Sequence, residues 1–525
     1  MQIRYYLILI LLVFSLVLNL GIYPLYLEEP RRAVVSLEML ISGNYIVPTI
    51  MGELYFAKPP LFNWIIILFS KILGGISELT VRLPTVVSLL LIGIFHYLVS
   101  FRYIGKNVAF YSSIAFITSG TILFYFSLLG EIDIFYSLIT YLCIISIFWF
   151  FYHNHKLLFV FPFIFASAGF LTKGFPSVLF LYITLITVFF FEKRLRLIFS
   201  IWHVIGVLIF IATLGSYLYL YNQFFPVEKY ILYLWKESSQ RTVVENAFSQ
   251  FVYHFFEFPL KTLVAVLPWS FLIIFLFEKG TFSAIIKNKF LRFSLIVFAF
   301  NYAVYWFSPG ANQRYVYMLF PFLLTIFVYM YFKGFISLFK VRLIKFIYSS
   351  VLLIFALVSI SLLFVKYFKS LSFLSYISIF FGIIFLILSF RVWKKPVYYM
   401  VIGLIWFRVL FDMVYLPIKA ISGTSFLEKK YGIQVADLTK GHNLFYYGKD
   451  RVSYGLLFYI ENNRKSILKK FLKIKEDNYY LSKKKFLKEN LNIEKVLEFK
   501  IKDNYVLFKK IGNTSSYNTI KSTIP

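Results

Sequence analysis

Charged residues are scarce in this sequence. Asp, Glu, Lys and Arg make up only 15% of the 525 residues, and hydrophobic residues make up 60%, whereas about a quarter of an ordinary soluble protein is charged. The apolar residues also occur in runs too long for the core of a soluble domain. These features exclude an ordinary water-soluble enzyme and predict a protein that crosses a membrane several times.

Acidic residues are the least common charged type. The chain has 24 Asp and Glu against 54 Lys and Arg, which gives a formal charge of +30. A nucleic-acid-binding protein carries such an excess on one solvated face, but here the basic residues mostly separate apolar runs. We therefore expect membrane lipids as partners, and no nucleic acid.

Cysteine is nearly absent. Cys143, the single cysteine, lies inside an apolar run, which excludes an intramolecular disulfide and a cysteine-rich metal site. The six histidines show no H-x-x-x-H spacing, so no zinc motif is supported. The chain also lacks a Walker loop and a G-x-S-x-G motif. We therefore predict no metal-ligating residues and no nucleotide site, and the sequence leaves a divalent-metal requirement open.

Long apolar runs are the main feature that is present. A bilayer core requires about 20 apolar residues per helix, which gives about thirteen candidate spans. They lie near residues 5–26, 83–101, 108–127, 132–152, 157–171, 175–191, 198–221, 260–277, 292–307, 315–332, 346–365, 371–390 and 397–416. The first run is too long for a signal peptide. The stretch 61–76 is short and predicts an interfacial or re-entrant helix.

The cations between the spans predict the orientation, because cytoplasmic loops are enriched in Lys and Arg. If Arg4 is cytoplasmic, alternate loops carry many cations and the opposite short loops carry few. The richer loops hold Arg102, Lys106, Lys156, Lys193, Arg194, Arg196, Lys279, Lys287, Lys289, Arg292, Lys333, Lys340, Arg342, Lys345, Arg391, Lys394 and Lys395, and the poorer ones hold Lys173, Arg314, Lys366 and Lys369. We predict a multi-pass protein of the cell (inner) membrane with a cytoplasmic N-terminus.

Three segments do not fit a membrane span. Residues 27–60 and 222–258 are expected to form outer-face loops of a transmembrane module over 1–416. Residues 417–525 are expected to form a soluble extracytoplasmic α/β domain, with strands at 444–448, 495–501 and 505–511. Helices are predicted at 453–464 and in the lysine-rich stretch 464–475. The fold class is therefore an α-helical polytopic membrane protein with a small C-terminal α/β domain.

The first candidate functional residues follow the first span. Glu28 and Glu29 could serve as a general base, since carboxylates suit that role when they are partly buried. Arg31 offers a bidentate fork for a phosphate. The alternative interpretation is a solvated loop whose charges compensate each other.

A second candidate is Lys58, which lies between Tyr55 and the pair Pro59-Pro60. The prolines fix an extended entry into the helix at 61–76, which would hold the ammonium at headgroup depth. The alternative is a lysine that only extends its head group toward water.

Further candidates lie at predicted outer helix ends. Glu131 and Asp133 begin the span at 132–152, and residues at i and i+2 do not share a helix face. Lys173 lies in a cationic turn, and Arg314 and Tyr315 follow a Ser-Pro-Gly turn. Charges at such places are functional suspects. The alternatives are a helix-capping acid for Glu131 and helix-end anchors for Lys173 and Arg314.

Taken in order, these motifs resemble one family. The motifs are the acidic pair, E-x-L-x-S-G-N-Y-x-x-P at 38–48, Tyr55, K-P-P-L at 58–61 with Trp64, R-L-P at 82–84, L-T-K-G at 171–174, and Arg314-Tyr315 before Pro321. Over about residues 20–335 the chain resembles the lipid-dependent GT-C glycosyltransferases of family 39. That family includes the lipid A aminoarabinose transferases and the dolichyl-phosphate-mannose protein mannosyltransferases.

The resemblance implies a sugar donor on a polyprenyl phosphate and a catalytic cavity at the outer side of the membrane. An acid of the first loop would act as base or position the acceptor, which is a lipid, glycan or protein. Lys58, Arg31 and Arg314, with Lys173 as a weaker candidate, would neutralise the leaving phosphate. Tyr55, Glu131 and Tyr315 would line the cavity. No nucleotide is implied.

Two points stay open in the sequence. The family usually begins its first loop with Asp-Glu, whereas this chain has Glu28-Glu29, so either acid could be the base, with Asp133 as a further catalytic acid. The main alternative function is a transporter or flippase of lipid-linked sugars, which would place ionisable groups in mid-span. A non-catalytic scaffold that presents the basic tail is a second alternative.

Overall fold

The computed structural model describes residues 2–239, 247–333, 337–364, 372–471, 473–475, 478–487 and 493–510. The chain divides into two compact units. One, called here the helical unit, comprises Met1–Tyr23 and Phe56–Ile418. The other, the sheet unit, comprises Pro24–Tyr55 and Lys419–Pro525. The first loop therefore packs with the C-terminal tail. Whether the tail is a separate extracytoplasmic domain stays a prediction.

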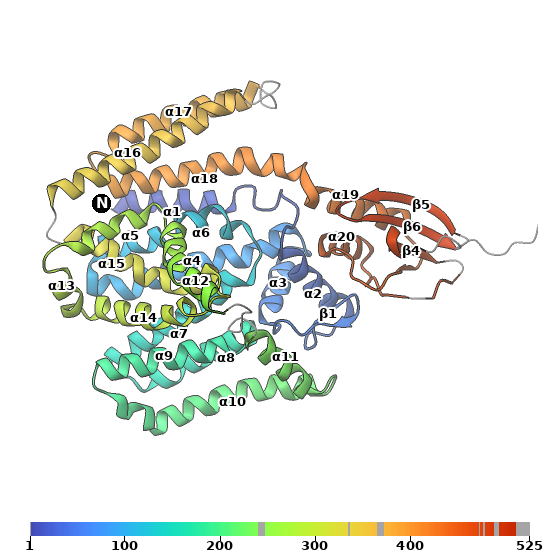
Figure 1. Cartoon of the computed structure of the whole chain (residues 1–525), viewed down its shortest axis with the longest axis horizontal. Helices are drawn as coiled ribbons and strands as arrows, with labels where there is room; N and C mark the ends of the chain where they lie inside the picture. The colour runs from blue at the N-terminus through green and yellow to red at the C-terminus, as the bar shows by residue number, and fades with distance from the viewer. Residues whose placement is uncertain are drawn as a thin grey trace, which may run out of the picture. The chain divides into compact units, whose positions relative to one another are not determined.

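The helical unit is almost entirely helical (Figure 1). Its α-helices are α1 (Gln2–Val17), α3 (Leu61–Ile72), α4 (Glu78–Ile104), α5 (Lys106–Ile117), α6 (Gly120–Phe124), α7 (Ile132–Tyr152), α8 (Phe161–Lys173), α9 (Pro176–Phe191), α10 (Ile201–Asn222), α11 (Val227–Ser239), α12 (Ala247–Ala265), α13 (Thr281–Lys287), α14 (Lys289–Trp306), α15 (Phe320–Lys333), α16 (Leu338–Ser361), α17 (Ser372–Arg391) and α18 (Pro396–Ala420). Short 3₁₀ helices are η1 (Phe126–Leu128), η2 (Lys156–Phe159), η3 (Leu195–Phe199), η4 (Trp269–Phe277), η5 (Gln313–Leu319) and η6 (Leu362–Phe364).

The chain is a multi-pass integral membrane protein. Within the described residues, seven helices are long and apolar enough to cross a membrane, or up to nine if two bent pairs are counted as one span each. The seven are Glu78–Ile104, Ile132–Tyr152, Lys156–Lys173, Ile201–Asn222, Gln313–Lys333, Leu338–Phe364 and Pro396–Ala420. Several other predicted spans, including the first and the one at 175–191, correspond to shorter apolar helices, so the number thirteen stays a prediction. Lys366 and Lys369 lie outside the described residues.

The predicted span at 260–277 is wrong as a single straight helix. Phe248–Ala265 and Trp269–Phe277 are bent by 115° at the break that holds Pro268, because proline lacks the N–H group that a continuing helix needs. The predicted span at 108–127 is also bent, by 47° between Ile117 and Gly120. The two breaks meet, since the amide of Gly120 donates to the carbonyl of Leu267 at 2.7 Å.

A buried ion pair supports the break between α6 and η1. Arg408 and Asp412 of α18 are fully buried, and the Nε atom of Arg408 lies 2.6 Å from Oδ2 of Asp412. The Nη1 atom of Arg408 donates to the carbonyl of Leu123 and, at 2.7 Å, to the hydroxyl of Ser127. At this break the guanidinium thus adds a donor to the carbonyl of Leu123, which also accepts from the hydroxyl of Ser127 at 2.7 Å.

The sheet unit is built on a four-stranded sheet with the order β3-β4-β6-β5. The strands are β3 (Leu444–Tyr446), β4 (Tyr479–Lys483), β5 (Ile493–Lys500) and β6 (Asn504–Lys510), and only β3 and β4 pair in parallel. Its helices are α2 (Glu29–Ser42), α19 (Gly423–Leu438) and α20 (Tyr454–Arg464), with the hairpin β1 (Thr49–Ile50) and β2 (Glu53–Leu54) and the 3₁₀ helix η7 (Lys484–Phe486).

The sequence predicts the tail only in part. Strands at 444–448, 495–501 and 505–511 are confirmed as β3, β5 and β6, while β4 is missed. The predicted lysine-rich helix at 464–475 is wrong, because the described residues after Arg464 are not helical. Arg464 stops α20 by donating at 2.6 Å to the hydroxyl of Thr439 and to the carbonyl of His442, and Lys465 turns left-handed with φ 53°.

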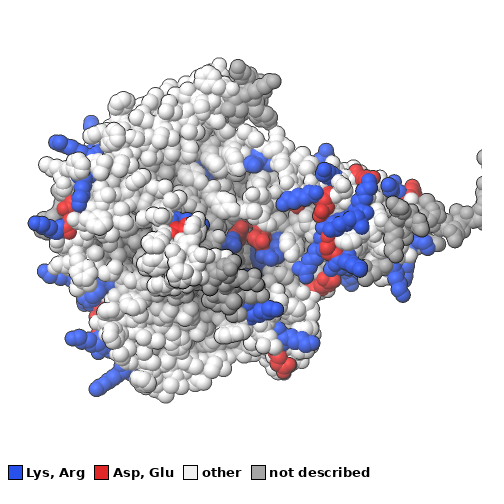
Figure 2. Space-filling model, viewed as in Figure 1, with Lys and Arg blue, Asp and Glu red and all other residues white. Residues whose placement is uncertain are grey.

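Charge is distributed unevenly over the helical unit. Figure 2 shows Lys and Arg side chains gathered along the end where Figure 1 labels the N-terminus and α13, while the surface between the two ends is almost bare of charge. Such a bare band is the expected surface of a protein that faces hydrocarbon.

Candidate active site

Four charged side chains of the helical unit meet at the ends of three helices. Glu131 and Asp133 lie at the start of α7, Lys173 is the last residue of α8, and Arg314 lies in η5. Nζ of Lys173 is 2.5 Å from Oδ1 of Asp133. Nη1 of Arg314 is 3.0 Å from Oε2 of Glu131 and 3.7 Å from Oδ2 of Asp133. We call these four residues the charged cluster.

The charged cluster is largely removed from solvent. The exposed side-chain fractions are 5% for Asp133 and Glu131 and 7% for Lys173. Buried charges are tolerated only when they are paired and hydrogen-bonded, and here two acids balance two bases. Lys173 and Arg314, for which the alternative interpretation was a helix-end anchor, each pair with an acid.

Two aromatic rings surround the lysine. Nζ of Lys173 lies 4.7 Å from the ring centroid of Tyr136 and 5.1 Å from that of Tyr315. The guanidinium carbon of Arg314 lies 5.7 Å from the same Tyr315 ring. Cation–π contacts at these distances attract each base to the rings. Tyr136 is a functional neighbour that the sequence analysis missed, since it lies within an apolar run of many aromatics.

Arg314 is the most accessible member of the charged cluster. Its side chain is 29% exposed, and among the described residues its Nε atom has no hydrogen-bond partner. Lys173, by contrast, is surrounded by Asp133 and the two tyrosines. An anionic ligand that approached the cluster would therefore meet the guanidinium of Arg314 before the ammonium of Lys173.

Local backbone features place these residues. A Cβ atom on Gly130 would lie 2.5 Å from a methyl carbon of Val81, so glycine allows the start of α7 to approach α4 closely. Gly174, with φ +80°, ends α8 directly after Lys173. Asn312 caps η5, since its side chain accepts from the amide of Arg314 at 3.3 Å.

Lys58 lies half-buried in the segment before α3. This helix packs near the charged cluster, because the rings of Phe62 and Phe135 are 5.6 Å apart, and Phe135 is on the first turn of α7. The predicted short helix at 61–76 is present as α3 (Leu61–Ile72).

The first-loop acids differ sharply from each other within the sheet unit. Glu29 is fully buried, and its Oε2 atom accepts from the amide of Tyr26 at 2.8 Å, so it holds the turn that begins α2. Glu28 is 44% exposed and forms an ion pair with Arg31. Of the two acids, Glu28 is the one that a substrate could reach.

The first-loop arginines are held by tyrosines. Burial opposes the charge of Arg31, but Tyr55, Glu28 and Tyr454 raise its pKa above the ordinary value. Arg32 is buried and donates to the hydroxyl of Tyr55 at 2.8 Å. Tyr55 therefore supports α2, a role that the sequence alone does not indicate.

Two further buried acids occur in the sheet unit. Glu38, on α2, accepts hydrogen bonds from the hydroxyl of Thr49 at 2.6 Å and from the amides of Met51 at 2.5 Å and Gly52 at 3.1 Å. Oε1 of Glu461 accepts from the amide of Leu468 at 2.9 Å, and its Oε2 atom has no hydrogen-bond partner among the described residues. Burial raises the pKa of both acids, and Glu38 raises that of Glu461 further.

No described group of three or more His, Cys, Asp or Glu side chains could hold a metal ion. The charged cluster has only two carboxylates, and both are paired with bases. The cluster is therefore a set of two bases held by two acids.

Comparison with known proteins adds an independent observation. Residues 57–219 match the family model described as dolichyl-phosphate-mannose-protein mannosyltransferase. This segment contains Lys58 and three of the four residues of the charged cluster. The predicted resemblance to family 39 is confirmed.

The fold is similar to that of a protein with known structures. The chain aligns with ArnT from Cupriavidus metallidurans bound to undecaprenyl phosphate with a TM-score of 0.73 at 17% identity, over 96% of this chain and 97% of that one. The apo form of the same protein gives a TM-score of 0.70 at 14% identity, with the same coverage.

Sequence relatives match this chain over shorter lengths. Undecaprenyl phosphate-alpha-4-amino-4-deoxy-L-arabinose arabinosyl transferase 1 of Proteus mirabilis is 28% identical over 309 residues, which is 56% of this chain and 52% of the relative. The corresponding transferase of Pseudomonas savastanoi is 47% identical over 58 residues, or 11% of each chain. An uncharacterized protein of Aquifex aeolicus is 28% identical over 298 residues, or 55% of this chain and 56% of that one. The matches thus span about half or less of the relatives' length.

Proposed function

We propose that the protein is a membrane glycosyltransferase that moves a sugar from a polyprenyl-phosphate donor to a hydroxyl or phosphate acceptor. The observation that carries this proposal is the charged cluster, in which a partly open arginine lies beside a buried lysine and two acids at helix ends. The family match over residues 57–219 supports it, since that segment supplies most of the cluster.

The donor phosphate is proposed to bind at the exposed side of Arg314. Its planar guanidinium can replace part of its contact with Glu131 by a bidentate contact with phosphate oxygens. Lys173 and Lys58 add positive charge. This arrangement stabilises the charge that develops on the lipid phosphate as the sugar leaves.

The transfer step is proposed to proceed with inversion. An acceptor oxygen attacks the anomeric carbon while the bond between that carbon and the lipid phosphate oxygen breaks, and the phosphate leaves as an anion. Glu28 takes the acceptor proton in this proposal, because it is the accessible acid of the first loop, while Glu29 is committed to the turn before α2. Asp133 orients Lys173 and the site by its ion pair.

The donor class is inferred from the relatives. Relatives are named as transferases of 4-amino-4-deoxy-L-arabinose from undecaprenyl phosphate, and the structural relative was crystallised with undecaprenyl phosphate. We propose an undecaprenyl-phosphate sugar as donor, and lipid A, a cell-envelope glycan or a protein as acceptor.

The proposed orientation is a cytoplasmic N-terminus with the charged cluster, the first loop and the C-terminal residues on the outer side. The cation bias of the loops supports it. About thirteen helices are proposed to cross the membrane, with the shorter apolar helices tilted or supported by their neighbours.

The proposal is tested by transfer of a radiolabelled sugar from undecaprenyl phosphate in membranes that contain the full chain. We expect Glu28→Gln, Lys58→Ala and Arg314→Gln to lower transfer by at least about tenfold, the effect of one charge-assisted contact. Glu53→Gln is the matched control for Glu28→Gln, because Glu53 is equally exposed, at 46%, and pairs with Lys470. Undiminished transfer in all three variants would contradict the assignment.

The same membranes separate transfer from transport. A flippase would move the lipid-linked sugar across the bilayer without forming a new glycosidic bond, so labelled donor would change sides while the labelled acceptor stayed absent. Formation of labelled acceptor that depends on Arg314 excludes that alternative.

A further inference from the structure

A second cationic site lies at the other end of the helical unit from the charged cluster. Helix Gln313–Lys333 carries Arg314 near its first residue and Tyr331 and Phe332 near its last. The last two side chains line a cavity of about 300 Å³. The cavity is therefore separated from the charged cluster by the length of a membrane-crossing helix.

The cavity is formed where four helices end. Its lining comes from the first two turns of α1 and α5, from the start of α18 and the two residues before it, and from the last turn of α15. The complete lining is Arg4, Tyr5, Asn107, Tyr111, Tyr331, Phe332, Lys394, Lys395, Pro396, Val397 and Tyr398. It holds three cations, four tyrosines and one asparagine, and it contains no acid.

The cations of this cavity have no acidic partners. Among the residues that the structure describes, Arg4, Lys394 and Lys395 form no ion pair. This differs from the charged cluster, in which each base pairs with an acid. Like charges that gather without compensation repel each other, and an anion between them relieves that repulsion.

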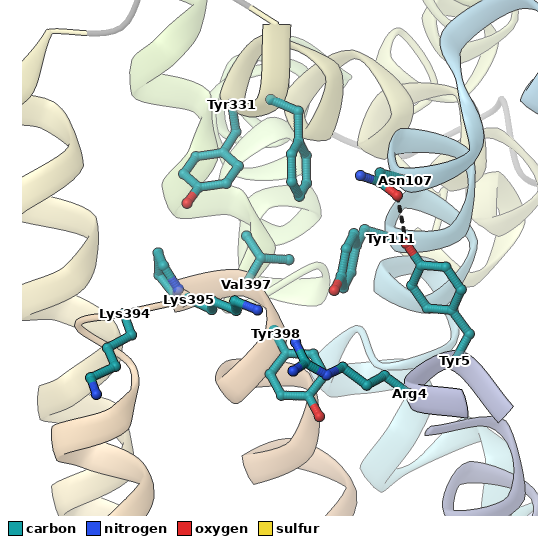
Figure 3. A pocket seen from close by; sticks show the side chains of 11 residues that line it. Arg4, Tyr5, Asn107, Tyr111, Tyr331, Lys394, Lys395, Val397 and Tyr398 are labelled. Atoms are coloured by element: carbon teal, nitrogen blue, oxygen red, sulfur yellow. Dashed lines mark hydrogen bonds between the residues drawn. The ribbon is translucent and has the colours of Figure 1, made fainter. Parts of the chain in front are cut away.

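The side chains are arranged as a binding pocket. Figure 3 shows Arg4 and Lys395 extending toward the space bordered by Tyr111 and Tyr398, and Lys394 at the rim. Tyr5 is fixed by a hydrogen bond of 2.5 Å from its hydroxyl to the side-chain oxygen of Asn107. The hydroxyl groups of Tyr111 and Tyr398 add neutral donors, which an anion requires beside the cations.

Helix ends add to the positive potential. Helix α5 begins at Lys106 and α18 begins at Pro396, so the positive ends of both helix dipoles lie next to the cavity. Membrane-surface cations near such a pocket are typical of sites for anionic head groups. Topology alone does not require a cavity or tyrosines beside its anchoring cations.

We propose that this cavity binds a phosphate group at the membrane surface opposite the charged cluster. Two sources share that chemistry: the phosphodiester of an anionic phospholipid, and a free phosphate from solution. The proposal does not depend on glycosyl transfer, since the cavity shares no residue with the charged cluster.

The test uses the full chain purified in a neutral detergent. One arm measures retention of dioleoyl phosphatidylglycerol against dioleoyl phosphatidylcholine by native mass spectrometry, and the other measures radiolabelled inorganic phosphate by equilibrium dialysis. We expect the double variant Arg4→Gln with Lys395→Gln to lower the affinity for the anion by at least about tenfold, because two charge-assisted contacts are lost.

Two further variants make the result decisive. Lys279→Gln with Lys289→Gln removes the same charge from the same predicted face outside the cavity and should bind as the wild type does. Tyr111→Phe with Tyr398→Phe keeps every cation, and therefore the topology signal, but should weaken binding by about threefold or more through lost hydroxyl donors.

The outcomes separate the two sources and the failure of the proposal. Preferential retention of phosphatidylglycerol, lost in the cavity variants, identifies a lipid head group, and binding of inorganic phosphate with the same variant pattern identifies a free phosphate. The proposal is overturned if neither anion binds, if the lysine control loses as much binding as the cavity variant, or if the tyrosine variant binds like the wild type. None of these readouts uses the sugar donor, so failure here leaves the transfer proposal untouched.

Discussion

The charged cluster and the cationic cavity occupy the two ends of helix Gln313–Lys333, and they treat charge in opposite ways. In the cluster, two largely buried acids lie within hydrogen-bond or ion-pair distance of the buried Lys173 and the partly exposed Arg314. In the cavity, three cations line an open space without an acid. Pairing lets the cluster remain buried before a ligand arrives, whereas the cavity stays hydrated until an anion replaces water. The comparison shows that similar cations differ in their properties according to whether an acid lies beside them.

The largest expected effect comes from breaking the buried pair of the charged cluster. Asp133→Asn or Lys173→Met should lower the free energy of unfolding by about 3–5 kcal/mol, since either change leaves a buried charge without its partner. The double variant should recover much of that stability and remain inactive in sugar transfer. Thermal unfolding in detergent and the transfer assay measure the two effects. Full activity of the double variant would show that the pair is only structural.

A second buried pair provides the matched comparison. Arg408→Met should destabilise the protein by a similar amount, about 3 kcal/mol or more, because Asp412 loses its partner and the carbonyl of Leu123 loses a donor. Transfer per folded molecule should stay near that of the wild type, since Arg408 serves the helix break. A selective loss of transfer in well-folded protein would instead give the Arg408–Asp412 pair a role in the reaction, like that proposed for the charged cluster.

The sheet unit offers the opposite case, in which two acids meet without a base. Burial and the neighbouring Glu38 hold the pKa of Glu461 above its usual range, so its contribution to stability is full below the unfolded-state pKa and is lost as pH rises through the folded-state pKa. Glu461→Gln should therefore reduce the loss of unfolding free energy at rising pH, by about 1–3 kcal/mol at the upper end of the pH range. Unfolding at a series of pH values gives the comparison, and an unchanged slope would refute it.

The smallest effect is expected at the cationic cavity. Lys395→Gln should change the free energy of unfolding by less than about 0.5 kcal/mol, because the side chain is exposed and unpaired within the described chain. Added salt should weaken anion binding at the cavity while leaving the buried Lys173–Asp133 pair nearly unaffected. At 0.5 M salt the Debye length is about 4 Å. Denaturation with and without this salt tests the stability statement, and phosphate dialysis in the same two buffers tests the binding statement. A large loss of stability in Lys395→Gln would assign that lysine to the packing of α18.

The sequence predicts many helices of the helical unit, because a run of apolar residues is a local property of the sequence. It does not predict the bend at Pro268, since a window average records apolar side chains and not the missing amide group. It also fails for the lysine-rich stretch after Arg464. Lysine favours helices locally, but the side chain of Arg464 and the left-handed Lys465 end α20 there.

The sequence indicates each member of the charged cluster separately, but it does not indicate which acid pairs with which base. Asp133 and Lys173 were candidates because charges at span ends are costly. Their contact joins helices forty residues apart along the chain, and only packing of α7 against α8 creates it. Tyr136 was missed for a related reason, because one tyrosine among many aromatics carries no sequence signal until a lysine lies over its ring.

The length of the helix that joins the two ends can be compared with the thickness of the bilayer. Gln313–Lys333 has 21 residues, part 3₁₀ and part α-helix, and so is roughly 35 Å long, slightly more than the hydrocarbon core of about 30 Å. Arg314 and Tyr331 can both reach an interface only in a membrane of suitable depth. In a thinner bilayer the helix must tilt, and the two ends then shift sideways relative to each other. Lipid chain length therefore sets how well both polar ends meet their head groups at once.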